Sequence, residues 1–433
     1  SAVIGEEGND AIDNYGVFYG QFDLGAGTNT FVNKPQGLLV SGPELVLGIS
    51  SNQLINEGIL RPGGMQLAQV GNLAGSFTQT AQAIAELCLL AGCLVASPLL
   101  QAQNTDWTPL NLAMTDAVVI PAYERFAAAT APLARNAAGF CAAIDADSLA
   151  ALQQDFSAAY DGWQGVQHIQ FGPITWFNWN FRLQFWPDDK GTGARQLDAL
   201  LATADPAVLV PEAFAQQSVG VQGFPALERL LFSDDSLVAL QNEPYRCQTV
   251  QAISRNLDDI ASGVAQRWRD EFRTTVANAD ERGFFESAED ATIDYLKAVV
   301  ESVRRIQQQK VQPVLGDNQA AARERRAEAW RMDRSVQHMR TNVAALAALF
   351  NDSAPALSSV LQPADLPNIQ QAFATLQQHL ADAPDSMNTA ITTAEGYAAF
   401  KQVDADLDAL FELLEAGVKG TDLYLGFNSL DGD

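Results

Sequence analysis

The stretch Cys247-Gln-Thr-Val-Gln-Ala-Ile-Ser-Arg-Asn-Leu-Asp-Asp-Ile260 decides the class of fold. Its apolar side chains recur every three or four residues, at Val250, Ile253, Leu257 and Ile260, which is the period of an amphipathic α-helix. The same period continues from about residue 106 to the end of the chain. It predicts helices over residues 109–138, 146–169, 193–203, 225–232, 245–279, 287–312, 319–350, 367–383 and 388–416.

Strand patterns are nearly absent from this part of the sequence, and several of the predicted helices are long enough to build a bundle. We therefore predict an all-α fold of two packed helix bundles. The first bundle would comprise residues 107–240 and the second residues 241–433, with a pocket between them. The Arg-rich run from Arg323 to Arg334 mixes both signs of charge at helical spacing, which is typical of a solvated helix face.

The charge balance excludes one class of partner. The 433 residues include 26 Lys and Arg against 52 Asp and Glu, a formal net charge of −26. Proteins that bind a phosphate backbone rely on Lys and Arg, so we expect no nucleic-acid partner. The chain has only 3 His and 4 Cys, which leaves little material for a zinc site built from several of these residues. His338 and His379 are isolated, and we expect ordinary core or surface positions for them.

Residues 1–85 differ from the rest of the chain. They are rich in Gly, and short apolar runs such as 37–42 and 45–50 are bounded by Gly and Pro. This pattern predicts short strands and turns in a Gly-rich extension, without a catalytic signature. No repeat with a period of 20–50 residues is visible in the sequence.

Residues 86–106 form an apolar segment that resembles an export signal. The run from Leu87 to Leu100 is too short to span a membrane and matches a signal-peptide core followed by small residues. Leu90-Ala-Gly-Cys93 has the form of a bacterial lipoprotein box, in which Cys93 would carry the lipid and provide the only membrane contact. A buried helix is the alternative, because the segment is internal and lacks a preceding basic region.

Two further cysteines bear on the compartment. Cys141 follows a predicted helix of the first bundle, and Cys247 lies near the start of a helix of the second. If the protein is exported, these two residues are the natural disulfide pair. The alternative is two buried free thiols.

Two regions carry a family resemblance. One is Trp163-Gln-Gly-Val-Gln-His-Ile-Gln-Phe-Gly-Pro173 with Arg182-Leu-Gln-Phe-Trp-Pro-Asp188, and the other is Ser218-Val-Gly-Val-Gln-Gly-Phe-Pro-Ala-Leu-Glu-Arg-Leu-Leu-Phe232. Over residues 107–433 the chain resembles the imelysin family of exported bacterial helical proteins. The resemblance implies a periplasmic or outer-membrane-associated protein of a Gram-negative bacterium, with a link to the cell envelope and to iron uptake.

The family's GxHxxE motif, from which a metallopeptidase activity was proposed, corresponds to Gly223-Phe-Pro-Ala-Leu-Glu228. Pro225 stands at the His position and offers no lone pair to a metal. Proline is nevertheless tolerated in the first turn of a helix, and a carboxylate such as Glu228 is favourable near a helix start. Many relatives carry Glu at the position of Gln167, beside which His168 stands. Glu228 and His168 are the remaining candidate ligands for a divalent metal or iron.

The leading hypothesis is a non-catalytic envelope protein that binds a small ligand or metal ion between the bundles. Its candidate ligand-binding residues are Gln167, Arg182, Trp186, Asp188, Ser218, Gln222, Gly223, Pro225 and Glu228. One alternative is a metallopeptidase with Glu228 as general base. The other is a structural protein that binds an envelope protein partner. Glu228 could also be a structural carboxylate, bonded to backbone N–H groups or paired with Arg182 or Arg229.

Overall fold

The computed structural model divides the chain into two compact units, Ser1–Thr105 and Asp106–Asp433. It describes residues 2–4, 9–23, 28–46, 52–57, 59–61, 69–71, 76–79 and 84–85 of the first unit, and residues 106–279 and 283–425 of the second. The signal-like segment with Cys93 lies outside the described residues.

The second unit is helical, as the apolar periodicity predicted. Its α-helices are α1 (Thr108–Met114), α2 (Ile120–Phe140), α3 (Ala146–Gln164), α4 (Trp179–Leu183), α5 (Thr192–Thr203), α6 (Pro211–Phe214), α7 (Phe224–Leu231), α8 (Ser236–Asn242), α9 (Pro244–Arg267), α10 (Arg273–Ala277), α11 (Ala288–Arg305), α12 (Gln312–Leu315), α13 (Ser335–Asn351), α14 (Leu366–Asp382), α15 (Met387–Thr392) and α16 (Ala394–Lys419). Three π-helical stretches join neighbouring helices without a break: η1 (Thr115–Val119), η5 (Trp268–Phe272) and η6 (Ile306–Val311). None of the described helices is long and apolar enough to cross a membrane.

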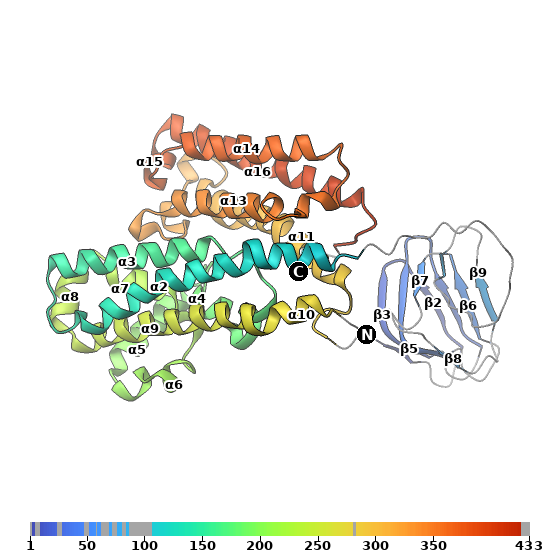
Figure 1. Ribbon diagram of the computed structural model, residues 1–433, viewed down its shortest axis with the longest axis horizontal. Coiled ribbons are helices and arrows are strands. Elements are labelled where there is room, and N and C mark those ends of the chain that lie inside the picture. Colours follow the sequence, from blue (N-terminus) through green and yellow to red (C-terminus); the bar gives the residue numbers. More distant parts are fainter. Residues whose placement is uncertain are drawn as a thin grey trace. The chain divides into compact units, whose positions relative to one another are not determined.

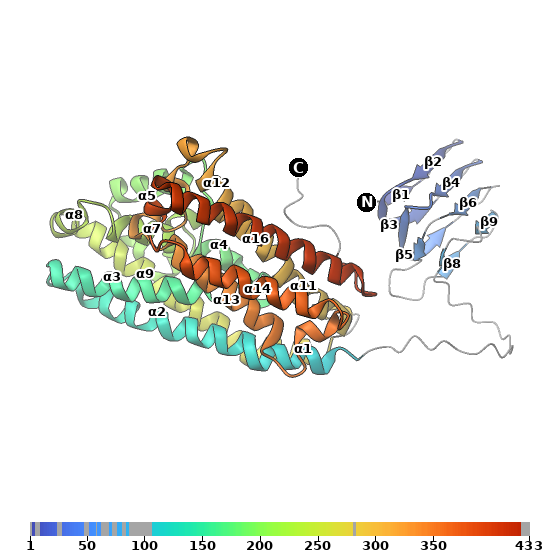
Figure 2. The ribbon, with the colours of Figure 1, turned by 90° about the horizontal axis from the view of Figure 1, so that it is seen from above.

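The long helices form two packed groups (Figures 1 and 2). Helices α2, α3 and α9 lie side by side, and α11, α13, α14 and α16 make up the other group. Helix α3 contacts α13, so one hydrophobic core continues through both groups. The strongest helix pairing joins α2 to α9. The sequence analysis set the boundary between the two bundles at residue 240, which would assign α9 to the second bundle. In the structure α9 packs with α2, in the group of N-terminal helices.

Local signals fix several helix ends. The side chain of Asp145 accepts a hydrogen bond from the backbone N–H of Ser148, while the Ser148 hydroxyl accepts one from the backbone N–H of Asp145. This reciprocal capping satisfies N–H groups at the start of α3 that have no partner within the helix. Thr393 caps α16 in a similar way through the N–H of Gly396.

The disulfide between Cys141 and Cys247 is present, as the sequence predicted. It joins the residue that follows α2 to the first turn of α9 and spans a sequence separation of 106 residues. Closing such a long loop removes conformational entropy from the unfolded chain. The bond therefore reinforces the α2–α9 pairing.

One predicted helix is wrong over its first half. Residues 319–334 are irregular, with short 3₁₀ turns at Gln319–Ala321, Glu324–Arg326 and Trp330–Met332, and α13 begins only at Ser335. Ala329 and Asp333 adopt positive φ values, which a regular helix excludes. The charge pattern of this run favours a solvated helix. Tertiary bonds made by Glu328, described below, override that local preference.

The first unit contains the predicted short strands, arranged in two parallel sheets. One has the strand order β1 (Ala2–Ile4), β3 (Val17–Asp23), β5 (Leu38–Val46), β7 (Ile59–Arg61), β10 (Ile84–Ala85), with β8 (Gln69–Gly71) also paired to β5. The other has the order β2 (Ala11–Asn14), β4 (Thr30–Asn33), β6 (Gln53–Asn56), β9 (Ser76–Gln79). Each sheet thus stacks every second strand in parallel register, which indicates a solenoid-like coil.

This coil corrects the expectation that no repeat is present. Asn14, Asn33 and Asn56 occupy equivalent positions on successive strands, and each amide donates to the next, with N–O distances of 2.8 Å. The separations along the chain are 19 and 23 residues. Because these coils differ in length, no single fixed period marks them in the sequence.

We predict that the double variant Cys141→Ser/Cys247→Ser unfolds more easily than the wild type. The free energy of unfolding in urea should fall by about 2–4 kcal/mol, because the long loop is no longer closed in the unfolded chain. Dithiothreitol should lower the wild-type midpoint and leave that of the variant unchanged. Equal midpoints for oxidised wild type and variant would show that the bond does not constrain the fold.

Candidate functional site

One candidate site is a pocket of about 760 Å³ within the helical unit, lined by parts of α5, α7, the loop before α5 and the irregular segment before α13. Four of the residues predicted from the sequence line it: Trp186, Asp188, Pro225 and Glu228. We call it the arginine pocket, because four arginines line it as well: Arg229, Arg325, Arg326 and Arg331.

Helix α7 presents the motif residues to this pocket. Gly223 is the cap of α7, and Pro225 lies in its first turn, where the missing N–H costs nothing. A Cβ at Gly223 would lie 2.2 Å from the carbonyl oxygen of Leu183, so the helix start packs directly on the neighbouring backbone. Glu228 is the fifth residue of α7. The expectation that it falls in the first turn is therefore wrong by one turn.

Glu228 is a buried carboxylate with a backbone partner. Its side chain is almost fully covered, and Oε1 accepts a hydrogen bond from the backbone N–H of Arg331 at 2.9 Å. Burial raises the pKa of Glu228, and the neighbouring Arg331 opposes that shift. The structure thus places the motif carboxylate against the irregular segment, where it accepts a bond from backbone of another part of the chain.

A buried ion network lies behind the pocket and was missed by the sequence analysis. Lys310 Nζ donates to Glu328 Oε2 at 2.9 Å, to Gln164 Oε1 at 2.8 Å and to Asn342 Oδ1 at 2.7 Å. Glu328 Oε2 also lies 2.9 Å from Nδ1 of His338. Lys310, Glu328 and His338 are all buried. Glu328, Gln164 and Asn342 thus each accept a hydrogen bond from the Lys310 ammonium.

The network shifts the proton affinities of its members. Burial alone would raise the pKa of Glu328, but Lys310 and His338 outweigh it and hold that pKa far below its ordinary range. Burial lowers the pKa of Lys310, and Glu328 only partly compensates. For His338, burial is outweighed by the carboxylates of Asp161 and Glu328, which raise the pKa. The partners of His338 are distant in the sequence, because Asp161 lies on α3 and Glu328 lies in the irregular segment. The sequence around His338 therefore gives no sign of these contacts.

The rim of the arginine pocket is crowded with positive charge. The guanidinium carbons of Arg325 and Arg331 lie 5.2 Å and 4.3 Å from the ring centroid of Trp330. Burial lowers the pKa of Arg331, and nearby Arg229 and Arg325 add to that shift against the pull of Glu228. Arginines stacked on an indole ring present a planar array of donors that suits carboxylates and phosphates.

Some acidic residues in the pocket are already engaged. Asp188 accepts hydrogen bonds from the backbone N–H groups of Thr192 and Gly193, at 2.7 Å and 2.8 Å, at the start of α5. Asp198 outside the pocket pairs with Arg229 at 3.5 Å. Among the described residues, Arg325 and Arg326 have no carboxylate partner. The pocket therefore offers unpaired cationic groups in a strongly acidic protein.

The other predicted site residues do not line this pocket. Arg182 bonds to Gln222 and Asn256, at 2.7 Å and 2.8 Å, which ties α4 to α9. Ser218 bonds to Gln196, and Gln167 bonds to Gln164 next to the ion network. These side chains hold segments of the fold together. His168 lies in a different pocket.

The residues present do not fit the metal site that the peptidase motif implies. Among the described residues, no group of three or more His, Cys, Asp and Glu side chains lies close enough to hold a metal ion. Pro225 replaces the one imidazole of the motif, and Glu228 bonds to backbone. A hydrolytic zinc site needs about three protein ligands and an open position, and no step of a metal-dependent hydrolysis follows from these residues.

Comparisons with known proteins agree with the fold. Residues 119–416 match the family model described as imelysin. The iron-regulated protein A of Synechococcus elongatus is 22% identical over 318 residues, which cover 70% of this chain and 83% of that protein. Two crystal structures share the fold. An imelysin-like protein from Psychrobacter arcticum has a TM-score of 0.62 at 21% identity, covering 74% of this chain and 97% of its own. A putative iron-regulated protein A precursor from Parabacteroides distasonis has a TM-score of 0.58 at 13% identity, covering 72% and 94%.

We predict that Glu328→Gln destabilises the helical unit by about 3–5 kcal/mol, because the buried Lys310 ammonium loses its carboxylate. The double variant Glu328→Gln/Lys310→Met should recover part of this loss, since both buried charges are then removed. Urea unfolding measures both. The control Glu415→Gln breaks an exposed pair with Lys419 and should cost less than about 1 kcal/mol. Additive single effects of Glu328 and Lys310 would contradict a coupled pair.

We also predict a pH dependence that His338 carries. Its pKa is raised in the folded state above the ordinary value of 6.5. Its stabilisation is therefore fully present below pH 6.5 and is lost as the pH rises through the folded-state pKa. The difference in unfolding free energy between wild type and His338→Gln should shrink across that window. A difference that is constant, or that grows with pH, would contradict the assignment.

Proposed function

Because the chain belongs to the imelysin family, we propose that it is a non-catalytic binding protein of the cell envelope that takes an anionic ligand in the arginine pocket. The observation that carries the proposal is the group of four arginines in this pocket, of which Arg325 and Arg326 have no carboxylate partner among the described residues. A site with these donors favours a small molecule that bears two or more carboxylates.

The names of the relatives support an iron-related role. The Synechococcus elongatus protein is called iron-regulated, and the Parabacteroides distasonis protein is called a precursor, which suits export. Polycarboxylates are also chelators of hard cations such as ferric iron, whose preferred ligands are oxygen atoms. The proposed ligand is a polycarboxylate, either free or as its metal chelate. The cation would then be carried by the ligand and not by protein side chains.

The chemistry of the pocket favours this ligand over a bare cation. The pocket wall carries four arginines against three carboxylates, Asp188, Asp189 and Glu228, so the excess charge that a free metal ion would meet is positive. Glu228 is buried, has a raised pKa and already accepts a backbone hydrogen bond. An anion would instead gain from several guanidinium groups at once.

We predict that citrate or ferric citrate binds the purified protein, as measured by isothermal titration calorimetry. The double variant Arg325→Gln/Arg326→Gln should weaken binding roughly 10–100-fold, because each exposed arginine contributes about 1 kcal/mol after screening by water. Both side chains are exposed, so folding should be unaffected. The matched control Arg323→Gln changes an exposed arginine of the same segment that does not line the pocket, and should leave binding unchanged.

Three outcomes would overturn the proposal. One is the absence of binding for both citrate and ferric citrate. Another is equal affinity in wild type and the double variant. The third is zinc-dependent cleavage of an unfolded protein that is lost in Glu228→Ala, which would restore the peptidase. If ferric citrate alone binds, the chelate is the ligand; if both bind equally, the carboxylates suffice.

A further inference from the structure

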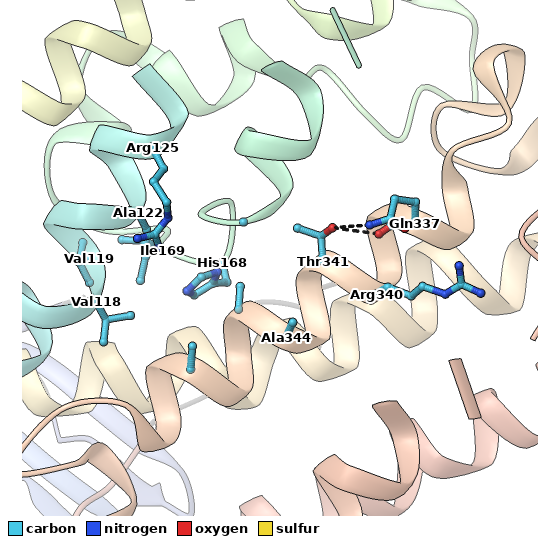
Figure 3. Close-up of a pocket in the computed structure, with 13 residues that line it drawn as sticks. Val118, Val119, Ala122, Arg125, His168, Ile169, Gln337, Arg340, Thr341 and Ala344 are labelled. Atoms are coloured by element: carbon cyan, nitrogen blue, oxygen red, sulfur yellow. Dashed lines mark hydrogen bonds between the residues drawn. The ribbon is translucent and has the colours of Figure 1, made fainter. Parts of the chain in front are cut away.

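A second pocket lies in the helical unit, away from the arginine pocket, and shares no lining residue with it. Its volume is about 450 Å³, within the range of small-molecule sites. Figure 3 shows it between the chain of η1 and α2 on one side and α13 on the other. Small or branched apolar side chains form its walls, among them Val118, Val119, Ala122, Ile169 and Ala344.

One wall carries a buried histidine without a partner. His168 is only 5% exposed, and its Nδ1 is sealed from solvent with no hydrogen bond among the described residues. Burial, helped by the charge of Arg305, lowers the pKa of His168 to about 3. The imidazole is therefore neutral near pH 7, with one N–H donor and one acceptor. His168 lines the pocket, and with Nδ1 sealed, Nε2 is the nitrogen left for a contact with a ligand.

The rim of this pocket supplies one available charge. Arg125 on α2 is exposed, and no ion pair of Arg125 occurs among the described residues. Figure 3 shows its side chain along the same wall as Ala122 and Ile169. The other arginine, Arg340, is held by Asp385 and by the carbonyl oxygens of Leu380 and Ala383. Gln337 and Thr341 bond to each other.

We propose that this pocket binds a small monocarboxylate with an apolar body. The apolar body would pack on the valines and alanines and remove their surface from water. The carboxylate would pair with the Arg125 guanidinium and accept a hydrogen bond from the Nε2–H of His168. A neutral imidazole suits this role, because it can donate to the ligand without the cost of burying a second charge.

Octanoate is the probe, added to the full chain and followed by isothermal titration calorimetry. Octanoate should bind saturably, and 1-octanol, which has the same chain but no charge, should bind at least roughly tenfold more weakly. Arg125→Gln should weaken octanoate binding by a similar factor. Arg135→Gln is the matched control, because Arg135 is an exposed arginine of the same helix that does not line the pocket.

A filling variant separates pocket binding from surface adsorption. Ala344 is exposed on α13, so Ala344→Trp should fold normally, as judged by circular dichroism and the melting temperature, and should abolish octanoate binding by filling the pocket. Three results would overturn the proposal: no saturable binding to wild type, unchanged binding in Arg125→Gln, or equal affinities for octanoate and octanol. Loss of citrate binding in the arginine pocket would leave this proposal untouched, because the two sites share no residue.

Discussion

The contact between the Lys310 ammonium and the Glu328 carboxylate is the constraint on which the arginine pocket depends. The two charges lie 2.9 Å apart and are almost fully excluded from solvent. A buried charge without a partner destabilises a fold strongly, so the two backbones must be held where the charges meet. Lys310 lies in the π-helical stretch η6, and Glu328 lies in the irregular segment before α13. Both segments depart from a regular α-helix at the positions that bring Lys310 and Glu328 together.

The inward orientation of the Glu328 side chain determines which of its neighbours line the arginine pocket. Because its side chain points into the core, Arg325 and Arg326 before it and Trp330 and Arg331 after it line the pocket. The same orientation directs the backbone N–H of Arg331 to Glu228. Tyr160 stands between the two carboxylates: its ring stacks on Phe224 of α7 and meets His338 edge-on, with centroid distances of 4.4 Å and 4.5 Å. Core packing, ion network and pocket rim are therefore parts of one arrangement.

The sequence was sufficient for the periodic parts of this arrangement and insufficient for the rest. Apolar spacing predicted the helices around Val250 and Leu257, and the position of two cysteines at helix ends predicted their disulfide. It failed where a distant partner decides the local structure. Residues 319–334 have helix-forming composition, yet the bond from Glu328 to Lys310 requires a turn there. Glu228 and Pro225 of the motif line one pocket, but nothing in the spacing of Lys310, Glu328 and His338 shows that these three residues meet. Arg182 and Gln222 lie in the two regions of family resemblance, and in the structure they bond to each other and to Asn256.

The burial of Glu228 has an explanation that requires neither a metal nor a reaction. Gly223 lets α7 start against the backbone of Leu183, and Pro225 is compatible with that first turn, so the helix keeps its place without an imidazole at the motif position. From there Glu228 reaches the N–H of Arg331 and fixes the segment that carries the pocket arginines. A carboxylate in this role must keep its hydrogen bond, whereas a general base must be free to take a proton from water. The geometry of Glu228 meets the first requirement, which agrees with the binding role that we propose for the arginine pocket.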